Sequence, residues 1–255
     1  MKTLATTFTQ ADIDKLQDDE FYFGDEGGRF LSKSKVKTLI TDPKNLFAPS
    51  EKTIHMHLGT YLHQLLIEPS LANVEHIYDG ATRKNKGYQV MKAELIEAGD
   101  ENPMIALKSE VEMIDRLVAK MKAHPYMSDH IYELGNKYEV ANIMEVGGVL
   151  VKGKTDIITE SMNIDIKTTG DISRFRWSAK DFYYDVQAYL YRLLFDRPMV
   201  FFVACKKTEA LGVFNCSEDF YKNGERRFLK AVENYKKYYI DKELVLDNFL
   251  ITDTL

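Results

Sequence analysis

The chain has 255 residues, of which 45% are hydrophobic and 29% are charged, and its formal net charge is −5. These values are typical of a globular protein with a sizeable core, and they argue against a protein that coats nucleic acid through a large positive charge. Two cysteines, Cys205 and Cys216, are too few for a disulfide scaffold or a four-thiolate iron–sulfur cluster. The sequence has no apolar run of transmembrane length and no secretion signal, so we expect a cytoplasmic protein with no membrane partner.

The first half of the chain has hydrophobic residues at the spacing of amphipathic helices. The expected helices cover residues 32–42, 56–67, 88–98 and 109–124. In the second helix, the apolar stripe consists of Leu58, Leu62, Leu65 and Leu66. In the fourth, one face carries Val111, Ile114, Leu117, Val118 and Met121. Residues 1 to about 135 are therefore expected to be mainly helical.

Near residue 137 the pattern changes to period two with many β-branched residues, which is typical of strands. The expected elements are strands over 136–145, 147–158 and 163–168, a helix over 178–195, a buried strand over 198–205, its hairpin partner over 212–216 and a helix after residue 217. A helical crossover between strands predicts an α/β fold with a mixed sheet flanked by helices. No linker or repeat divides the chain, so we expect one domain over 1–255, with its sheet-containing core at about 136–255.

The stretch GKTDIITESMNIDIKT, residues 153–168, places acids where two strands are expected to pair. Alternate residues of a strand share a face, so Asp165 and Lys167 project together while Ile164 and Ile166 project into the core. If the turn centres between residues 160 and 161, Asp156 lies opposite Asp165. Facing like charges are destabilising, and a shared Mg²⁺ ion that also binds phosphate oxygens would offset them. The hairpin thus predicts a metal-dependent phosphodiester hydrolase site; the alternative is a solvated hairpin face.

Three further residues add to this hypothesis. Gln187 and Tyr191 lie four residues apart on one face of the following helix, and both can bind a phosphate or a water by hydrogen bonds. His63 flanks the apolar stripe beside Leu62, and a neutral imidazole can bind Mn²⁺ or complete a Mg²⁺ site. The alternatives are that Gln187 and Tyr191 lie on a half-buried helix edge and that His63 has only a structural role. Trp177 is expected to fill the core or to staple a helix entry, because single aromatic residues usually pack.

Basic residues cluster at several places in the sequence despite the negative net charge. The candidate contacts to a DNA backbone are Arg83, Lys84 and Lys86, in a loop between helices, and Lys152 and Lys154, which share the strand face of Asp156. Any one such cluster can also be a solvated face. Another group, at residues 33, 35 and 37, is interpreted in that way.

Taken together and in this order, the four parts of the pattern resemble the PD-(D/E)xK nuclease superfamily and, within it, the RecB-type nuclease group. These parts are His63 in GTYLHQLLIEP, Asp156 in KGKTDII, Asp165 and Lys167 in DIKTT, and Gln187 with Tyr191 in QAYLY. The opening LSKSKVKTLITDP is similar to that of the exodeoxyribonuclease VIII (RecE-type) domains of phages and prophages. The resemblance covers about residues 28–200 and implies a restriction-endonuclease-like core.

The resemblance also implies roles for individual residues. The implied metal ligands are His63, Asp156, Asp165 and the carbonyl of Ile166. Lys167 would be the catalytic lysine, while Gln187 and Tyr191 would organise the site and hold DNA. An accessory acid near the start of the sheet would be Glu139, with Glu145 as its rival.

The activity implied by the resemblance is Mg²⁺- or Mn²⁺-dependent 5′→3′ digestion of one strand from the ends of linear double-stranded DNA, which leaves 3′ single strands for recombination. Ring-shaped homo-oligomers, a single-strand annealing recombinase as partner, and a phage-infected or prophage-bearing bacterial cell are implied in the same way. The sequence lacks a long N-terminal extension, a cysteine quartet and the helicase motif GxxxxGK[ST], so we expect a stand-alone nuclease domain. The alternatives are an endonuclease or RNA-directed nuclease of this superfamily, or a non-catalytic scaffold that binds DNA ends.

Overall fold

The structure, a computed structural model, describes residues 3–49 and 52–241. Its α-helices are α1 Gln10–Lys15, α2 Asp19–Phe23, α3 Lys33–Thr41, α4 Ile54–Ile67, α5 Lys86–Glu97, α6 Lys108–Ala123, α7 Pro125–Ile131, α8 Phe175–Asp181, α9 Tyr184–Phe195 and α10 Glu218–Tyr235. Short 3-10 turns cover Gly27–Arg29, Pro43–Asn45 and Ile172–Arg174, and a π-helical turn, Lys236–Ile240, extends α10. The strands are β1 His76–Tyr78, β2 Ile105–Leu107, β3 Lys137–Val146, β4 Val149–Ile158, β5 Asn163–Thr169, β6 Met199–Cys205 and β7 Leu211–Asn215.

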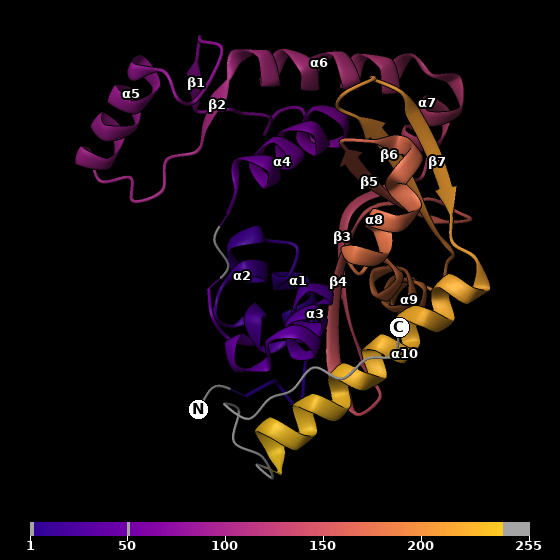
Figure 1. The fold of residues 1–255 in the computed structure, drawn as a ribbon. Helices are drawn as coiled ribbons and strands as arrows, with labels where there is room; N and C mark the ends of the chain where they lie inside the picture. The colour runs from indigo at the N-terminus through magenta and orange to yellow at the C-terminus, as the bar shows by residue number, and fades with distance from the viewer. Residues whose placement is uncertain (1–2, 50–51, 242–255) are drawn as a thin grey trace.

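The main sheet has five strands in the order β3-β4-β5-β6-β7. All neighbours are antiparallel except β5 and β6, which run parallel because the chain crosses over through α8 and α9 between them. This mixed sheet with flanking helices confirms the predicted α/β fold. In Figure 1, α4 to α7 form the upper part of the molecule, α1 to α3 lie at the lower left, and α10 crosses below the sheet.

The sheet is covered on both faces, as the run PMVFFVAC predicted. Alternate residues of β6 enter different cores: Phe201 and Val203 pack with residues of α3, α9 and α10, whereas Val200 and Phe202 pack with residues of α4, α6 and α7. Every residue of β6 is buried. The apolar face predicted for α6 is confirmed, because its five residues are all buried. The two cores fix α4 and α9 on opposite sides of β5.

The N-terminal segment completes the sheet at one end. Leu31 runs parallel to β4 at Val151 and exchanges backbone hydrogen bonds with Leu150 and Lys152. Helices α1 and α2 pack there in a separate small core with the middle of β3 and the start of β4. Because of this packing, α1 and α2 cover part of the strand face that carries Lys152.

The single helix predicted over 178–195 is wrong, because two helices, α8 and α9, meet there at a break. Tyr183 adopts a left-handed conformation with φ of 59°. Asp185, fully buried at the start of α9, accepts a hydrogen bond from Arg227 Nη1 of α10 at 3.1 Å, and Asn223 also donates to it. A Cβ at Gly224 would lie 2.0 Å from the Asp185 carbonyl, so this glycine lets α10 approach the break.

Two other observations bear on the predictions. The expectation that Trp177 packs in the core is wrong: its side chain is 59% exposed on α8. None of the described helices is both long and apolar enough to cross a lipid bilayer.

Candidate active site

Two buried acids stand where β4 and β5 begin to separate. The last paired residues of the ladder are Ile157 and Ile164, and the next residue on each strand is Asp156 and Asp165. This is the predicted register. Ile164 and Ile166 are fully buried in the core of α4 and α6, so Asp165 projects to the opposite face, as expected. Asp156 Oδ2 accepts a hydrogen bond from the Ile166 amide at 2.6 Å, so the carboxylate itself bridges the two strands.

His63 reaches this point from α4. Its Nε2 lies 2.8 Å from the Ile166 carbonyl oxygen, and its Nδ1 lies 3.5 Å from Asp156 Oδ2. Because a carbonyl only accepts, Nε2 carries the proton in this arrangement. The buried neighbours Leu58, Leu62 and Leu66 seat α4 on the sheet and thereby aim the imidazole at the acids. His63 therefore lies at the β4–β5 hairpin, where the sequence analysis expected it.

Glu139 of β3 brings a further carboxylate to this point. It has a left-handed φ of 49° within a strand, which is uncommon for a side chain other than glycine. The flanking pairs Tyr138 with Ile157 and Val140 with Thr155 place it directly across from Asp156. Ligand atoms of His63, Glu139 and Asp156 all lie within 4.8 Å of one another.

The rival acid, Glu145, is exposed near the other end of β3, where it pairs with Leu150. The structure therefore brings Glu139 to the site and leaves Glu145 away from it. The positive φ within β3 thus occurs at Glu139, the residue whose register position faces Asp156.

The acids of the site repel one another in a buried position. Burial and the neighbouring Asp156 carboxylate raise the pKa of Glu139. Burial also raises the pKa of Asp156, an effect that His63 opposes and Asp165 increases. A divalent cation would remove this repulsion, and two carboxylates with an imidazole are a donor set that suits Mg²⁺ or Mn²⁺. The residues present therefore fit a divalent cation.

The grouping of donors differs in part from the predicted ligand set. The three donors that lie together are His63, Asp156 and Glu139, the last of which was expected only as an accessory acid. The Ile166 carbonyl faces His63 Nε2. Asp165 is 1% exposed and is engaged by Lys167 and by Gln187 on α9.

Lys167 and Gln187 hold Asp165 from two sides. Lys167 Nζ forms an ion pair with Asp165 Oδ2, and Gln187 Nε2 donates to Asp165 Oδ1 at 2.5 Å. Burial lowers the pKa of Lys167, but Asp165 and Asp156 outweigh it and raise the pKa overall. Lys167 therefore stays protonated and can place a positive charge beside the acids.

Tyr191 has a different place from the one expected of a DNA contact. It is 7% exposed, and its hydroxyl donates to the Lys154 carbonyl at 2.7 Å and accepts from the Lys154 amide at 3.2 Å. A Cβ at Gly153 would lie 2.6 Å from the Tyr191 ring, so the glycine lets α9 approach β4. Tyr191 thus fixes the backbone of β4 two residues before Asp156 and helps to position that acid.

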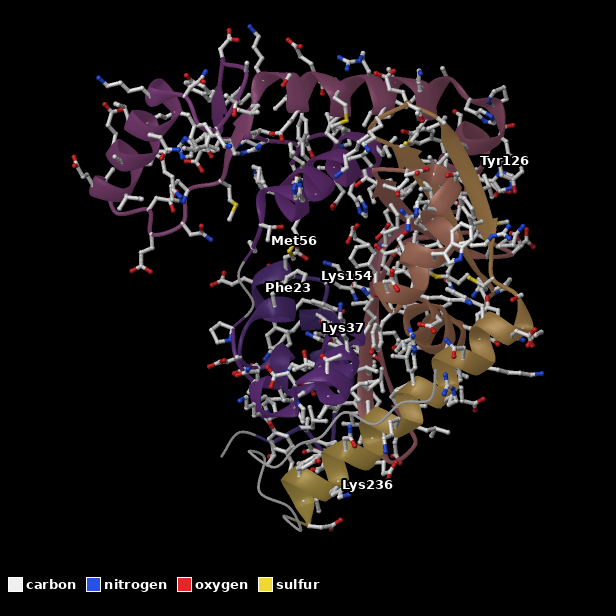
Figure 2. All side chains as sticks on the ribbon, viewed as in Figure 1. Phe23, Lys37, Met56, Tyr126, Lys154 and Lys236 are labelled. Atoms are coloured by element: carbon white, nitrogen blue, oxygen red, sulfur yellow. The ribbon has the colours of Figure 1, made fainter. Side chains whose placement is uncertain are left out.

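The expected DNA contacts of Lys152 and Lys154 are not supported by their positions. Lys152 is 4% exposed, donates to the Tyr22 carbonyl and lies 3.7 Å from the Tyr22 ring centroid. Lys154 Nζ binds Asp19 at 2.6 Å and the Gln17 carbonyl at 2.9 Å, between the N-terminal helices and the sheet (Figure 2). Helices α1 and α2 cover this strand face, and no local pattern in the sequence indicates this packing.

The expected contacts at Arg83, Lys84 and Lys86, in the loop before α5 and at the first residue of α5, are in part engaged with the protein. Arg83 forms an ion pair with Glu110 at 2.5 Å, whereas Lys84 and Lys86 are exposed. Contact of this loop with DNA remains a prediction.

Lys33 is a site residue that the sequence analysis missed. Its Nζ lies 4.8 Å from the centroid of the Tyr184 ring, and Lys167 Nζ lies 5.3 Å from the same centroid. Burial and the charge of Lys167 lower the pKa of Lys33 to about 8. In the sequence, Lys33 is marked only as part of a basic cluster. Its place near Lys167 depends on the packing of α3 beside α9, which no local pattern contains.

Comparisons with known proteins give a sequence family and a similar fold. Residues 32–243 match a sequence family described as a PDDEXK-like domain of unknown function (DUF3799). A crystal structure from Eubacterium rectale, described as a candidate exonuclease, has a similar fold with a TM-score of 0.61 and 15% identity, over 93% of this chain and 95% of that one. A phage-related exonuclease from Haemophilus somnus 129PT gives a TM-score of 0.34 with 13% identity, over 82% of this chain and 94% of that one. No protein with a curated record matches the sequence significantly.

The fold and the acid–lysine site define the class of PD-(D/E)xK proteins, whose core is restriction-endonuclease-like. Because the match covers most of the sequence, the chain belongs to the PDDEXK-like family named above. Family and site together support a nuclease.

Proposed function

We propose that the protein is a divalent-metal-dependent exodeoxyribonuclease that hydrolyses phosphodiester bonds from the ends of linear double-stranded DNA. The observation that carries this proposal is the convergence of Asp156, Asp165 and Lys167 with His63 and Glu139 where β4 and β5 separate. The similarity in fold to the candidate exonuclease from Eubacterium rectale supports the choice of exonuclease. The resemblance to RecE-type domains supports 5′→3′ polarity, a ring assembly and a recombinase that uses the 3′ strands.

The site residues would have different roles in the reaction. His63, Glu139 and Asp156 would hold the cation, with Asp165 beside them. A bound Mg²⁺ or Mn²⁺ ion would lower the pKa of a water molecule and polarise a phosphoryl oxygen. Lys167 stays protonated and stabilises the negative charge that builds on the phosphate.

The remaining groups position these residues. Gln187 fixes the orientation of the Asp165 carboxylate from α9. The Ile166 amide fixes Asp156, and the Ile166 carbonyl fixes the imidazole of His63. Asp165, Asp156 and His63 are thus each held by a hydrogen bond to a residue of a strand or helix, which favours one geometry of the site.

The test is digestion of a linear duplex and of the same duplex as a covalently closed circle, with Mg²⁺ and with chelator. We expect loss of the linear DNA only, dependent on metal and abolished by Asp165→Asn. Release of label from a 5′-labelled end before a 3′-labelled end would support the polarity. Cutting of the circle would indicate an endonuclease, and cleavage of RNA instead of DNA would indicate an RNA-directed enzyme. DNA binding with no cleavage of any substrate would indicate a scaffold.

A further inference from the structure

A cavity of about 380 Å³ lies beside the candidate active site, between the N-terminus of α4, the loop after β5 and helix α8. Its volume suits part of a small ligand or one nucleotide. The side chains that matter for its chemistry come from α8 and its flanks and from the turn after β6, and they are Arg174, Phe182, Tyr184 and Lys206.

The cavity adjoins the active site through two of its lining residues. Thr168, the residue after Lys167 on β5, lines its wall. Tyr184 lines it as well, and the ring of Tyr184 also lies beneath the ammonium groups of Lys167 and Lys33. The cavity therefore lies within reach of a DNA strand whose phosphate is at Lys167.

The lining combines cations with an exposed aromatic ring. Arg174 and Lys206 form no ion pair with any residue that the structure describes, and Arg174 is exposed. The one acid of the lining, Asp171, uses Oδ1 to accept from the Ser173 amide and hydroxyl. Phe182 is 53% exposed and lies 5.8 Å from the Tyr184 ring at 34°.

We propose that this cavity binds the nucleotide next to the scissile phosphate in a single-stranded segment of the DNA substrate. The base stacks on Phe182, and its phosphate binds Arg174 and Lys206. An exposed aromatic ring beside cations is the arrangement that holds unpaired nucleotides, because a base stacked inside a duplex does not offer its face to a side chain. This inference rests on the proposed nuclease function and names the form of DNA that the site takes.

The test measures affinity for a duplex with a short single-stranded tail, by fluorescence anisotropy, in an Asp165→Asn background with Mg²⁺ so that the DNA stays intact. We expect Phe182→Ala to weaken binding about tenfold for the normal tail and not for the same tail with abasic sites. Arg174→Ala combined with Lys206→Ala should weaken binding of both tails and reduce the dependence of affinity on salt.

Helix α8 provides matched controls. Trp177 is 59% exposed, and Arg176 is an exposed arginine of the same helix, yet neither lines the cavity. Trp177→Ala and Arg176→Ala should therefore bind both tails as the parent does. An equal effect of Phe182→Ala and Trp177→Ala, or an equal loss on the abasic tail, would overturn the proposal. Cleavage by the wild-type protein is measured separately, so failure of the nuclease function would be seen independently of the tail result.

Discussion

Gln187 Nε2 donates a 2.5 Å hydrogen bond to Asp165 Oδ1, and this contact joins the crossover helix α9 to strand β5. Both residues are buried, so no water competes for the bond. The position of α9 on the sheet therefore sets the orientation of the carboxylate.

Removal of this contact should loosen the metal site. We expect Gln187→Ala to require about tenfold more Mg²⁺ for half-maximal cleavage, because loss of a group that orients a ligand typically costs 10- to 100-fold in metal affinity or activity. Titration of the initial rate with Mg²⁺ measures this. Arg192→Ala, at an exposed position of α9, should keep the wild-type titration. An unchanged requirement in Gln187→Ala would show that the hydrogen bond is not needed.

Divalent cations should stabilise the folded protein. A ligand at about 100 times its dissociation constant adds about 2.7 kcal/mol to the free energy of unfolding, which for a chain of this size raises Tm by roughly 5–10 °C. Glu139→Gln should abolish most of the rise with Mg²⁺ or Mn²⁺. It should also raise Tm without metal, because it removes a repelling carboxylate. Glu145→Gln, on the same strand but away from the site, should respond to metal like the wild type. Equal responses of the two variants would contradict the assignment of Glu139.

Lys152 should make stability depend on pH. Burial lowers its pKa to about 7, from 10.5 for the free side chain, with a further contribution from Lys35. Between these values the unfolded chain binds a proton that the native protein lacks, so stability rises with pH in this range. The free energy of unfolding of the wild type, relative to Lys152→Met, should therefore increase from pH 7 to pH 10 by about 3 kcal/mol. A constant difference across this range would show that Lys152 stays charged in the fold.

The close approach of α9 to β4 should depend on Gly153. A Cβ there would lie 2.6 Å from the Tyr191 ring and 2.7 Å from Leu194, so Gly153→Ala should destabilise by about 1–3 kcal/mol and reduce cleavage. Chemical denaturation measures the first effect. Gly59→Ala on α4, where nothing lies within 4 Å of the added atom, should instead leave stability equal or raise it by up to about 1 kcal/mol. Equal stabilities of the two variants would contradict this account of the packing.

The sequence predicted the hairpin and its register well. Alternation of Ile and polar residues around Asp165 is a local signal, and the ladder at Ile157 and Ile164 confirms that Asp156 and Asp165 are opposite. The presence of His63 at the hairpin followed from the family resemblance, because no local pattern connects residues about a hundred positions apart.

Other features depend on contacts that no local pattern contains. The break between α8 and α9 lies beside the ion pair of buried Asp185 with half-buried Arg227, which are 42 positions apart. Lys152 and Lys154 were expected to face DNA, but Asp19 and Tyr22 of α2 cover them. In each case the missing information was the position of another helix.

The measurement that tests the central claim most directly is the single-turnover rate of cleavage of linear duplex DNA by Lys167→Met, beside Lys120→Met. Lys120, on α6, forms a surface ion pair with Glu209 at 3.0 Å. We expect Lys167→Met to lose about 10²- to 10³-fold in rate with DNA binding retained, and Lys120→Met to match the wild type. Cleavage by Lys167→Met at the wild-type rate would contradict the assignment of the β4–β5 acids and Lys167 as the active site.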